Sequence, residues 1–100
     1  MITADFGIIP IGIEDNNNIS KYVTAAVKSI KESGLNYELT GMGTQIEAQT
    51  LDELYEAVKK AQEEVFKCGS ERVYTVLKID DRRDRNRSLK DKIKTVNDSI

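Results

Sequence analysis

The segment Thr40-Gly41-Met42-Gly43-Thr44 brings together groups that suit the binding of a small heteroaromatic ring. Thr40 and Thr44 offer hydroxyl groups, Met42 offers a polarizable thioether, and the glycines leave backbone amides accessible. The same residue types are also typical of a plain β-turn, because glycine is common where a chain reverses. The segment therefore indicates either a binding loop or a simple turn.

Glu47 follows this segment on the same expected hairpin. A carboxylate beside a π-rich pocket could pair with an aminopyrimidine or balance the charge of a cationic ring. The alternative is an exposed glutamate that faces solvent, which is common on strands. Glu47 is therefore a candidate binding residue only if a pocket forms next to it.

A run of alternating charges, Lys78, Asp80, Asp81, Arg82 and Arg83, lies further along the chain. Such a run can bind a phosphate group, or its members can pair with one another in solvent. One hypothesis is an enzyme that uses Lys78, Asp80 and Asp81 with magnesium on a phosphate-bearing substrate. The sequence offers no nucleophile paired with a base, so we expect no catalytic residue.

The composition narrows the classes of function further. The chain has 100 residues, of which 39% are hydrophobic and 32% charged, and this predicts one globular domain. It has no histidine and one cysteine, Cys68, which excludes the imidazole and thiolate clusters of zinc, copper and iron sites. Histidine-dependent catalytic triads are excluded for the same reason. We therefore expect neither a metal site nor a cofactor.

Charge and hydropathy predict the surroundings of the protein. A net charge of −2 creates no field that would attract nucleic acid or an anionic membrane, so we expect neither as a partner. No apolar run approaches the roughly 20 residues that cross a bilayer. Cys68 cannot form an internal disulfide, and Asp5 interrupts an N-terminal stretch that lacks leading basic residues. We expect a cytoplasmic protein without a signal peptide.

The first third of the chain predicts a strand and a helix. Residues 2–13 are rich in isoleucine, and their glycines and Pro10 exclude a helix, so we expect a strand with a bend or bulge near Pro10. A polar turn at 15–18 precedes a helix that Ser20 caps and Gly34 ends. The apolar positions of this helix are Val23, Ala26, Val27 and Ile30.

The remainder predicts a hairpin, a second helix and a last strand. Residues 37–48 alternate between apolar and polar side chains around two glycines, whose access to positive φ predicts a tight β-hairpin. Thr50 and Glu53 form a capping box at the start of a helix that Gly69 ends. Residues 72–80 alternate again and predict a strand.

The order of these elements is β-α-β-β-α-β. Right-handed crossovers then place both helices on one face of a four-stranded antiparallel sheet, which is an α+β ferredoxin-like fold. We expect residues 1–84 to form this domain and residues 85–100 to form a charged extension with a short helix from Leu89. The apolar stripe of that helix predicts docking on the same subunit or on a neighbour. The stripe consists of Ile93, Val96 and Ile100.

The uncovered face of this sheet predicts a homo-oligomer. The first strand carries isoleucines on both faces, so the open face keeps apolar side chains whichever face meets the helices. A patch of this kind on a soluble chain usually marks a subunit interface, and we expect a homodimer or homotetramer. The alternative is a bulge near Pro10 that shifts the register and places these residues on a single face.

An RNA-recognition domain has the same element order and offers another interpretation. Its third strand carries an aromatic, glycine-containing signature, whereas this chain has Thr44-Gln45-Ile46-Glu47-Ala48 there and a negative net charge. Both features argue against RNA binding.

An ordered series of short motifs, from Met1 to about Asp84, resembles the thiamine-binding protein family, which is related to hydroxymethylpyrimidine/thiamine-binding proteins. The series is more specific than any one of its members. It comprises Ile8-Ile9-Pro10-Ile11-Gly12, Ser20-Lys21-Tyr22-Val23, Gly34-Leu35-Asn36-Tyr37-Glu38-Leu39-Thr40, Met42-Gly43-Thr44, Ile46-Glu47 and Lys78-Ile79-Asp80-Asp81-Arg82-Arg83-Asp84.

The resemblance implies a ferredoxin-like fold, assembly into dimers and tetramers, and binding of thiamine or its pyrimidine moiety, hydroxymethylpyrimidine, without chemical conversion. We therefore expect a non-catalytic small-molecule binding protein with a site near a subunit interface. The alternative is a regulatory or protein-interaction module that acts through its oligomeric sheet and charged tail. The residues that fall inside the matching motifs and become candidate ligand-binding residues are Tyr37, Thr40, Met42, Thr44 and Glu47.

Overall fold

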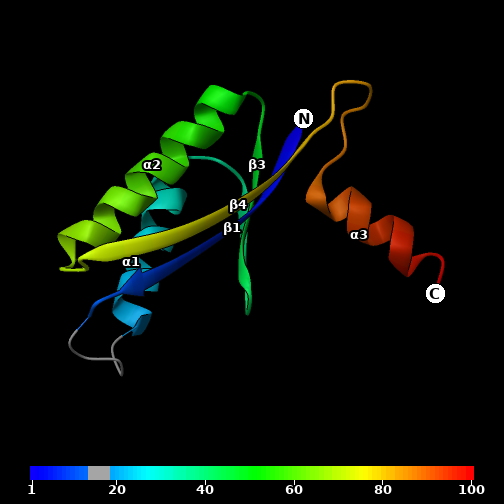
Figure 1. The fold of residues 1–100 in the computed structure, drawn as a ribbon. Coiled ribbons are helices and arrows are strands. Elements are labelled where there is room, and N and C mark those ends of the chain that lie inside the picture. Colours follow the sequence, from blue (N-terminus) through cyan, green and yellow to red (C-terminus); the bar gives the residue numbers. More distant parts are fainter. Residues whose placement is uncertain (14–18) are drawn as a thin grey trace.

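The computed structural model describes residues 1–13 and 19–100 as one α+β sandwich. Its four strands lie in the order β2-β3-β1-β4, and every neighbouring pair is antiparallel. Figure 1 shows α1 and α2 on one face of the sheet and α3 across the other face. The predicted ferredoxin-like fold is confirmed. The elements are β1 (Ile2–Ile11), α1 (Ile19–Glu32), β2 (Tyr37–Thr40), β3 (Gly43–Ala48), α2 (Leu51–Lys67), β4 (Arg72–Asp81) and α3 (Leu89–Asn97).

The core lies between the sheet and the helices α1 and α2. Alternate residues of β1 point into it, with Ile2, Ala4 and Phe6 all buried, because successive side chains of a strand point to opposite faces. Residues of α1 and α2 that are spaced three or four apart pack against these strand residues, since such positions share one face of a helix. The helical members of the core are Tyr22, Ala26, Ile30, Leu54, Ala57, Ala61 and Val65.

Pro10 continues β1 without a bulge. β1 pairs with β4 residue by residue, from Ile2 opposite Asp81 to Ile11 opposite Arg72. The pairing of β1 with β3 ends earlier, at Phe6, so Pro10 has a neighbouring strand on one side only. Proline is tolerated there because its missing N–H costs no hydrogen bond on the open side. The predicted bulge, and the register shift that it would have caused, are therefore wrong.

The helix boundaries confirm both predicted glycine stops and one of the two predicted N-cap residues. Gly34 and Gly69 end α1 and α2 with φ of +81° and +110°, a region that favours glycine. Ser20 lies inside α1, so the predicted cap is wrong. Thr50 does cap α2, and its hydroxyl accepts a hydrogen bond from the Glu53 N–H at 3.2 Å. The predicted polar turn at 15–18 lies outside the described residues.

The Glu53 side chain completes the cap of α2 in a different way from the predicted box. Its carboxylate accepts a hydrogen bond from the N–H of Gln49 at 3.3 Å, one residue before Thr50. The start of α2 is therefore stabilised from two sides, but without the reciprocal contact to Thr50.

The β2–β3 hairpin closes through a two-residue turn, Gly41-Met42, between the paired residues Thr40 and Gly43. The predicted positive φ at Gly41 and Gly43 is wrong, because neither residue has it. The Thr40 hydroxyl supports the turn instead. It donates to the Gly43 carbonyl at 2.8 Å and accepts from the Met42 N–H at 3.3 Å.

The face of the sheet opposite α1 and α2 divides into a polar half and an apolar half. Near α3 it carries polar and charged side chains such as Thr3, Gln45 and Asp80. At the other end Ile9, Tyr74 and Val76 are exposed at 54%, 53% and 42%. The predicted apolar open face is thus confirmed for one half only. Among the described residues, no helix is long and apolar enough to cross a membrane.

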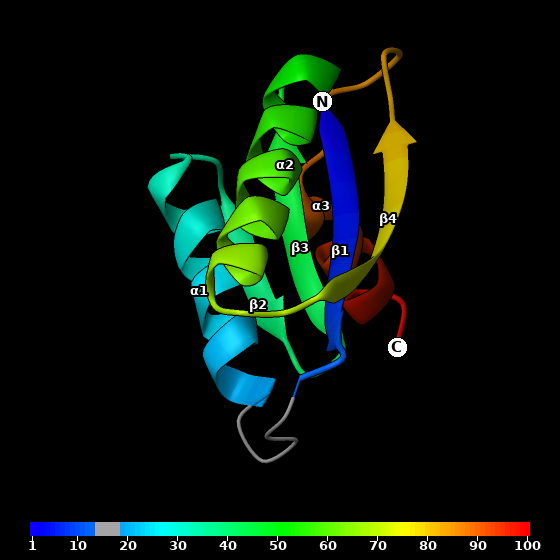
Figure 2. The same ribbon diagram turned by 60° about the vertical axis from the view of Figure 1, so that its left-hand side comes forward.

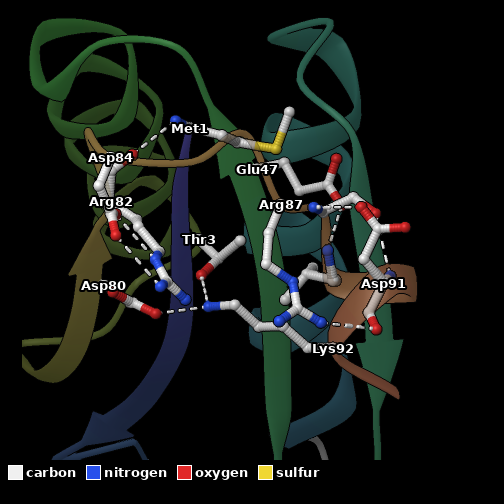
Figure 3. A network of polar contacts seen from close by, with 11 residues as sticks. Met1, Thr3, Glu47, Asp80, Arg82, Asp84, Arg87, Asp91 and Lys92 are labelled. Carbon is white, nitrogen blue, oxygen red and sulfur yellow. Dashed lines mark hydrogen bonds and ion pairs between the residues drawn. The ribbon is translucent and has the colours of Figure 1, made fainter. Parts of the chain in front are cut away.

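The helix α3 confirms the predicted short C-terminal helix, and its polar side chains hold it to the sheet. Lys92 donates to the Thr3 hydroxyl at 2.7 Å and contacts the Asp80 carboxylate at 2.5 Å (Figure 3). Ser88 and Asp91 form a capping box at its start. None of its residues is buried, and its apolar stripe is exposed. The helix therefore docks on its own subunit, but not through the stripe that predicted docking.

Candidate functional site

A hollow of about 460 Å³ opens where β1 leaves β3. The two strands pair only up to Phe6 and Thr44, so the rest of β1 and the tip of the hairpin diverge. One side of the hollow is formed by Gly7 and Ile9 of β1, and Val23 and Val27 of α1 also line it. The backbone of β1 beyond Phe6 has no strand partner on this side, which leaves polar groups available to a ligand.

Gly43 and Gly7 act differently on this hollow. A Cβ added to Gly43 would lie 3.0 Å from the backbone oxygen of Phe6, so only glycine allows the two strands to approach here. A Cβ added to Gly7 would have no atom within 4 Å. The hollow is thus tightly closed where the pairing ends and open along Gly7.

The walls of the hollow are largely apolar, and two opposite charges lie on its lining. Asp5 of β1 and Lys78 of β4 are paired positions on the open face of the sheet, and both line the hollow. An apolar cavity with a few polar groups is the usual form of a small-molecule site. The carboxylate can accept hydrogen bonds or balance a cation, and the ammonium can donate to a ring nitrogen.

The structure brings together three of the five residues that the sequence proposed. Thr40, Met42 and Thr44 line the hollow at the hairpin, whereas Tyr37 and Glu47 line a second hollow of about 280 Å³ beside the start of α3. Their roles within the first hollow also differ. Met42 is 94% exposed and free to contact a ligand, but Thr44 is buried. The Thr40 hydroxyl already has both partners described above.

Glu47 holds the start of α3 in place. Its carboxylate, labelled in Figure 3, accepts a hydrogen bond from the Leu89 N–H at 2.8 Å. It accepts another from the Asn36 side chain at 3.4 Å. A carboxylate at the N-terminus of a helix also interacts favourably with the helix dipole. The structure thus gives Glu47 a role in docking α3.

Sequence reasoning missed the contributions of Asp5, Gly7 and Val27 to the site. Asp5 had a readable signal, since it is the only charged residue between Met1 and Ile13. Burial of a carboxylate in the middle of an apolar strand costs free energy unless the group has a charged or hydrogen-bonding partner or access to solvent. Gly7 and Val27 gave no such signal, because their place depends on where β1 and β3 separate.

The charged end of β4 is internally paired. Arg82 contacts Asp84 and Arg83 contacts Asp81, both at 2.9 Å. The hydrogen bond from Arg83 lowers the pKa of the Asp81 carboxyl, and that from Arg82 lowers the pKa of Asp84. Of the two interpretations of this charge run, phosphate binding and mutual pairing in solvent, the contacts agree with mutual pairing. In residues 1–13 and 19–100, no group of three or more His, Cys, Asp or Glu side chains is arranged to hold a metal.

The chain matches the model of a known protein family over nearly its whole length. The family model described as thiamine-binding protein matches residues 4–97. The chain belongs to this family. The match continues beyond Asp84 and covers α3, so the similarity extends further than the sequence motifs indicated.

Family members from archaea and bacteria are similar along their whole length. A UPF0045 protein of Methanothermobacter thermautotrophicus is 53% identical, and the alignment covers 100% of both chains. The UPF0045 protein YqgV of Bacillus subtilis is 40% identical over 97% of this chain and 95% of its own. The hollow and α3 therefore lie within a region that this family shares.

Solved structures agree with the fold. The hypothetical protein MJ1052 of Methanocaldococcus jannaschii has a TM-score of 0.85 at 35% identity, covering 96% of this chain and 95% of its own. A putative thiamine biosynthesis/salvage protein of Thermotoga maritima has a TM-score of 0.79 at 19% identity, covering 95% and 97%. The second likeness supports the fold alone.

Proposed function

We propose that this protein binds thiamine or a related pyrimidine, without converting it, in the hollow between β1 and the β2–β3 hairpin. Family membership supports a small-molecule binding role. The observation that carries the proposal is the hollow itself. Its volume of about 460 Å³ lies within the range of roughly 300–1,000 Å³ that is usual for ligand sites, and its walls are apolar.

The lining of the hollow suits the chemistry of such a ligand. Thiamine combines an aminopyrimidine with a cationic ring, and both rings have apolar faces. Val23 and Val27 offer surfaces for these faces, and the Met42 thioether can contact a ring edge. The Asp5 carboxylate can accept a hydrogen bond from the amino group or balance the positive charge.

Binding without turnover agrees with the groups that line the hollow. The chain has no histidine, and Cys68 is not among the lining residues. The Thr40 hydroxyl donates to the Gly43 carbonyl rather than to a base. An activated nucleophile needs a base within hydrogen-bond reach, and the hydrogen bond that the Thr40 hydroxyl donates goes to a carbonyl group instead.

Amide chemical shifts measured by NMR during a thiamine titration test the location of the site. We expect the largest changes at Gly7, Ile9 and Val27, and we expect the ligand to be recovered unchanged. Changes centred on Asn36 and Leu89 would instead place the ligand in the second hollow. The absence of any saturable change with thiamine and with hydroxymethylpyrimidine would reject the proposal.

A blocking variant gives this experiment its control. Gly7→Leu should fill the mouth of the hollow and abolish the shifts, while the fold is kept because a Cβ at Gly7 meets no atom within 4 Å. Thr24→Leu adds the same side chain to the exposed side of α1, outside the hollow, and should leave binding unchanged. Equal loss of binding in both variants would show that the effect is not local.

A protein-interaction role is the second candidate, because α3 exposes its apolar stripe. Ile93 and Val96 are 48% and 60% exposed on a helix that polar contacts already hold. Such a stripe on a docked helix is an available contact surface. Retention of a specific protein partner that is lost in Ile93→Ser/Val96→Ser, without any small-molecule binding, would favour this candidate.

A further inference from the structure

The open face of the sheet, opposite α1 and α2, carries two neighbouring rows of polar side chains. Each row runs across β3, β1 and β4, which lie side by side in Figure 2 with α3 behind them. In one row, the α3 row, Thr3 is paired with Glu47 on one side and with Asp80 on the other. All three side chains contact α3, through the Leu89 N–H or the Lys92 ammonium. The polar groups of the α3 row are therefore bound by the protein itself.

The other row, the Asp5 row, has no such partners. In it Asp5 is paired with Gln45 of β3 and with Lys78 of β4. Within residues 1–13 and 19–100, none of these three side chains forms a hydrogen bond or an ion pair. The row also lies where two hollows meet, because Asp5 and Lys78 line both the hollow described above and a smaller one of about 230 Å³ beside Leu89. A carboxylate, an amide and an ammonium are thus available there to a ligand.

The next position along the strands has almost no side chains. After the last pair of β1 and β3, Gly7 comes next on β1 and Gly43 comes next on β3. Both positions belong to the open face, because they lie two residues from Asp5 and Gln45. With glycine at both, the backbone forms a floor beside the Asp5 row, and Val76 of β4 borders it. A flat ring can therefore lie on this glycine floor with one edge toward the Asp5 row.

The two ends of the glycine floor differ in polarity. At one end the Asp5 carboxylate reaches toward the floor, since a Cβ added to Gly43 would lie 3.3 Å from its Oδ1 atom. At the other end Ile9 and Tyr74 form an exposed apolar pair. The distance from Asp5 to Ile9 along β1 is about 13 Å, at about 3.3 Å per residue. The floor and its two ends thus form a slot that suits an aromatic ring with one polar edge.

We propose that this slot selects 4-aminopyrimidines over 4-oxopyrimidines, with Asp5 accepting a hydrogen bond from the amino group and Lys78 donating one to the adjacent ring nitrogen. The inference rests on the proposed function and adds the residues that determine specificity. A 4-aminopyrimidine presents a donor and an acceptor side by side, which matches a carboxylate and an ammonium on neighbouring strands. A 4-oxopyrimidine presents an acceptor and an N–H donor in these two places. Both hydrogen bonds would then be lost, and each charged group would face a group of the wrong kind.

The position of the larger hollow determines which way the ring faces. A 4-oxopyrimidine that is turned over could satisfy both Asp5 and Lys78, but turning the ring also moves its 5-substituent. With the amino group at Asp5 and the ring nitrogen at Lys78, the 5-substituent points toward the β2–β3 hairpin, where Met42 and Val27 line the hollow. In the turned ring it would point toward β4 and away from the hollow. A ligand with a large 5-substituent, such as thiamine, therefore has one favourable orientation.

Equilibrium dialysis with thiamine and with its 4-oxo analogue tests the selectivity. For the native chain, the dissociation constant of thiamine should be lower than that of the analogue by at least about tenfold. Asp5→Asn can accept from an amino group or donate to an oxo group, so the preference should disappear. Lys78→Met, which keeps the length of the side chain but removes the donor, should also reduce it. Lys59→Met, on the exposed side of α2, is the matched control and should keep the native preference.

Nuclear Overhauser contacts in the thiamine complex test the orientation of the ring. The 2-methyl group of the pyrimidine lies next to the ring nitrogen at Lys78, so it should contact the methyl groups of Val76 on the same strand. The methylene group at position 5 should contact the methyl group of Met42. The reverse pattern, with the 2-methyl group at Met42, would overturn the proposal.

The outcomes distinguish this inference from the proposed function. Saturable binding of thiamine with equal affinity for the 4-oxo analogue would overturn the inference and leave the binding function in place. A native preference that persists in both Asp5→Asn and Lys78→Met would do the same, provided that circular dichroism shows both variants to be folded. No saturable binding of thiamine or hydroxymethylpyrimidine would reject the proposed function and the inference together.

Discussion

At the scale of single residues, two glycines and one carboxylate define the candidate site. Gly43 allows β1 and β3 to approach at Phe6, Gly7 leaves the hollow open, and Asp5 supplies a charge on its lining. Three of the five predicted ligand-binding residues, Thr40, Met42 and Thr44, line the hollow, because they sit in or beside the turn that borders it. It grouped Tyr37 and Glu47 with them because separation along the chain does not reveal the second hollow beside α3.

Replacement of Gly43 tests the steric account. Gly43→Ala should lower the free energy of unfolding by about 1–3 kcal/mol, because its Cβ would lie 3.0 Å from the Phe6 oxygen and force the strands apart. Gly41→Ala, where an added Cβ meets nothing within 4 Å, is the control and should change stability much less. Chemical denaturation measures both. Equal effects would show that contact with Phe6 does not constrain Gly43.

Neutralisation of Asp5 tests the role of its charge. Asp5→Asn keeps the shape of the side chain but removes the negative charge, so the dissociation constant for thiamine should rise about tenfold or more, which corresponds to about 1.4 kcal/mol. Glu38→Gln, an exposed carboxylate outside the hollow, is the control. Equilibrium dialysis measures both. Unchanged affinity in Asp5→Asn would remove Asp5 from the site.

At the scale of elements, the pattern of apolar and polar residues and the residues that cap the helices determine most of the structure. Alternation in β4 and the capping and stop residues of α2 predicted these two elements, and helical spacing in α1 predicted the face on which Ala26 and Ile30 are buried. The errors occurred where the backbone context decides. Pro10 lies in an unbulged strand because β3 ends its pairing at Phe6, and α3 docks through Lys92 because the nearby sheet face is polar.

The N-cap residue of α2 should make a measurable contribution to the free energy of unfolding. Thr50→Ala removes the acceptor for the Glu53 N–H and should lower the free energy of unfolding by about 1 kcal/mol. Thr50→Ser, which keeps the acceptor, should cost far less. Thermal and chemical denaturation provide the measurement. If Thr50→Ser lowered the free energy of unfolding as much as Thr50→Ala, the effect would be due to the methyl group of Thr50 and not to its hydroxyl.

The capping box of α3 makes its N-terminus sensitive to acid. Hydrogen bonds from the Ser88 backbone and hydroxyl lower the pKa of Asp91 below its ordinary value of 3.8. Because the folded pKa is the lower one, the stabilisation is fully present above pH 3.8 and is lost as the pH falls through the folded pKa. NMR shifts of the α3 amides should report this transition. Asp91→Asn should abolish it, and a transition that persists in this variant would assign it to another group.

At the scale of the whole molecule, one face of the sheet is covered by helices and the other combines a polar half, docked to α3, with an exposed apolar half. The sequence predicted an apolar open face, but it could not show that charged side chains of β1 and β4 gather under α3. The hollow, the apolar half and the free edge of β4 lie close together, since Val76 belongs to all three. A ligand in the hollow is thus expected to lie beside the exposed apolar half of the sheet.

Isothermal titration of the native protein with thiamine tests the central claim most directly. Saturable heat with about one ligand per chain, abolished in Gly7→Leu and retained in Thr24→Leu, is the result that a binding site in the hollow predicts. Heat that is unchanged in a folded Gly7→Leu variant would contradict this location, and no saturable heat with thiamine or hydroxymethylpyrimidine would contradict the proposed function.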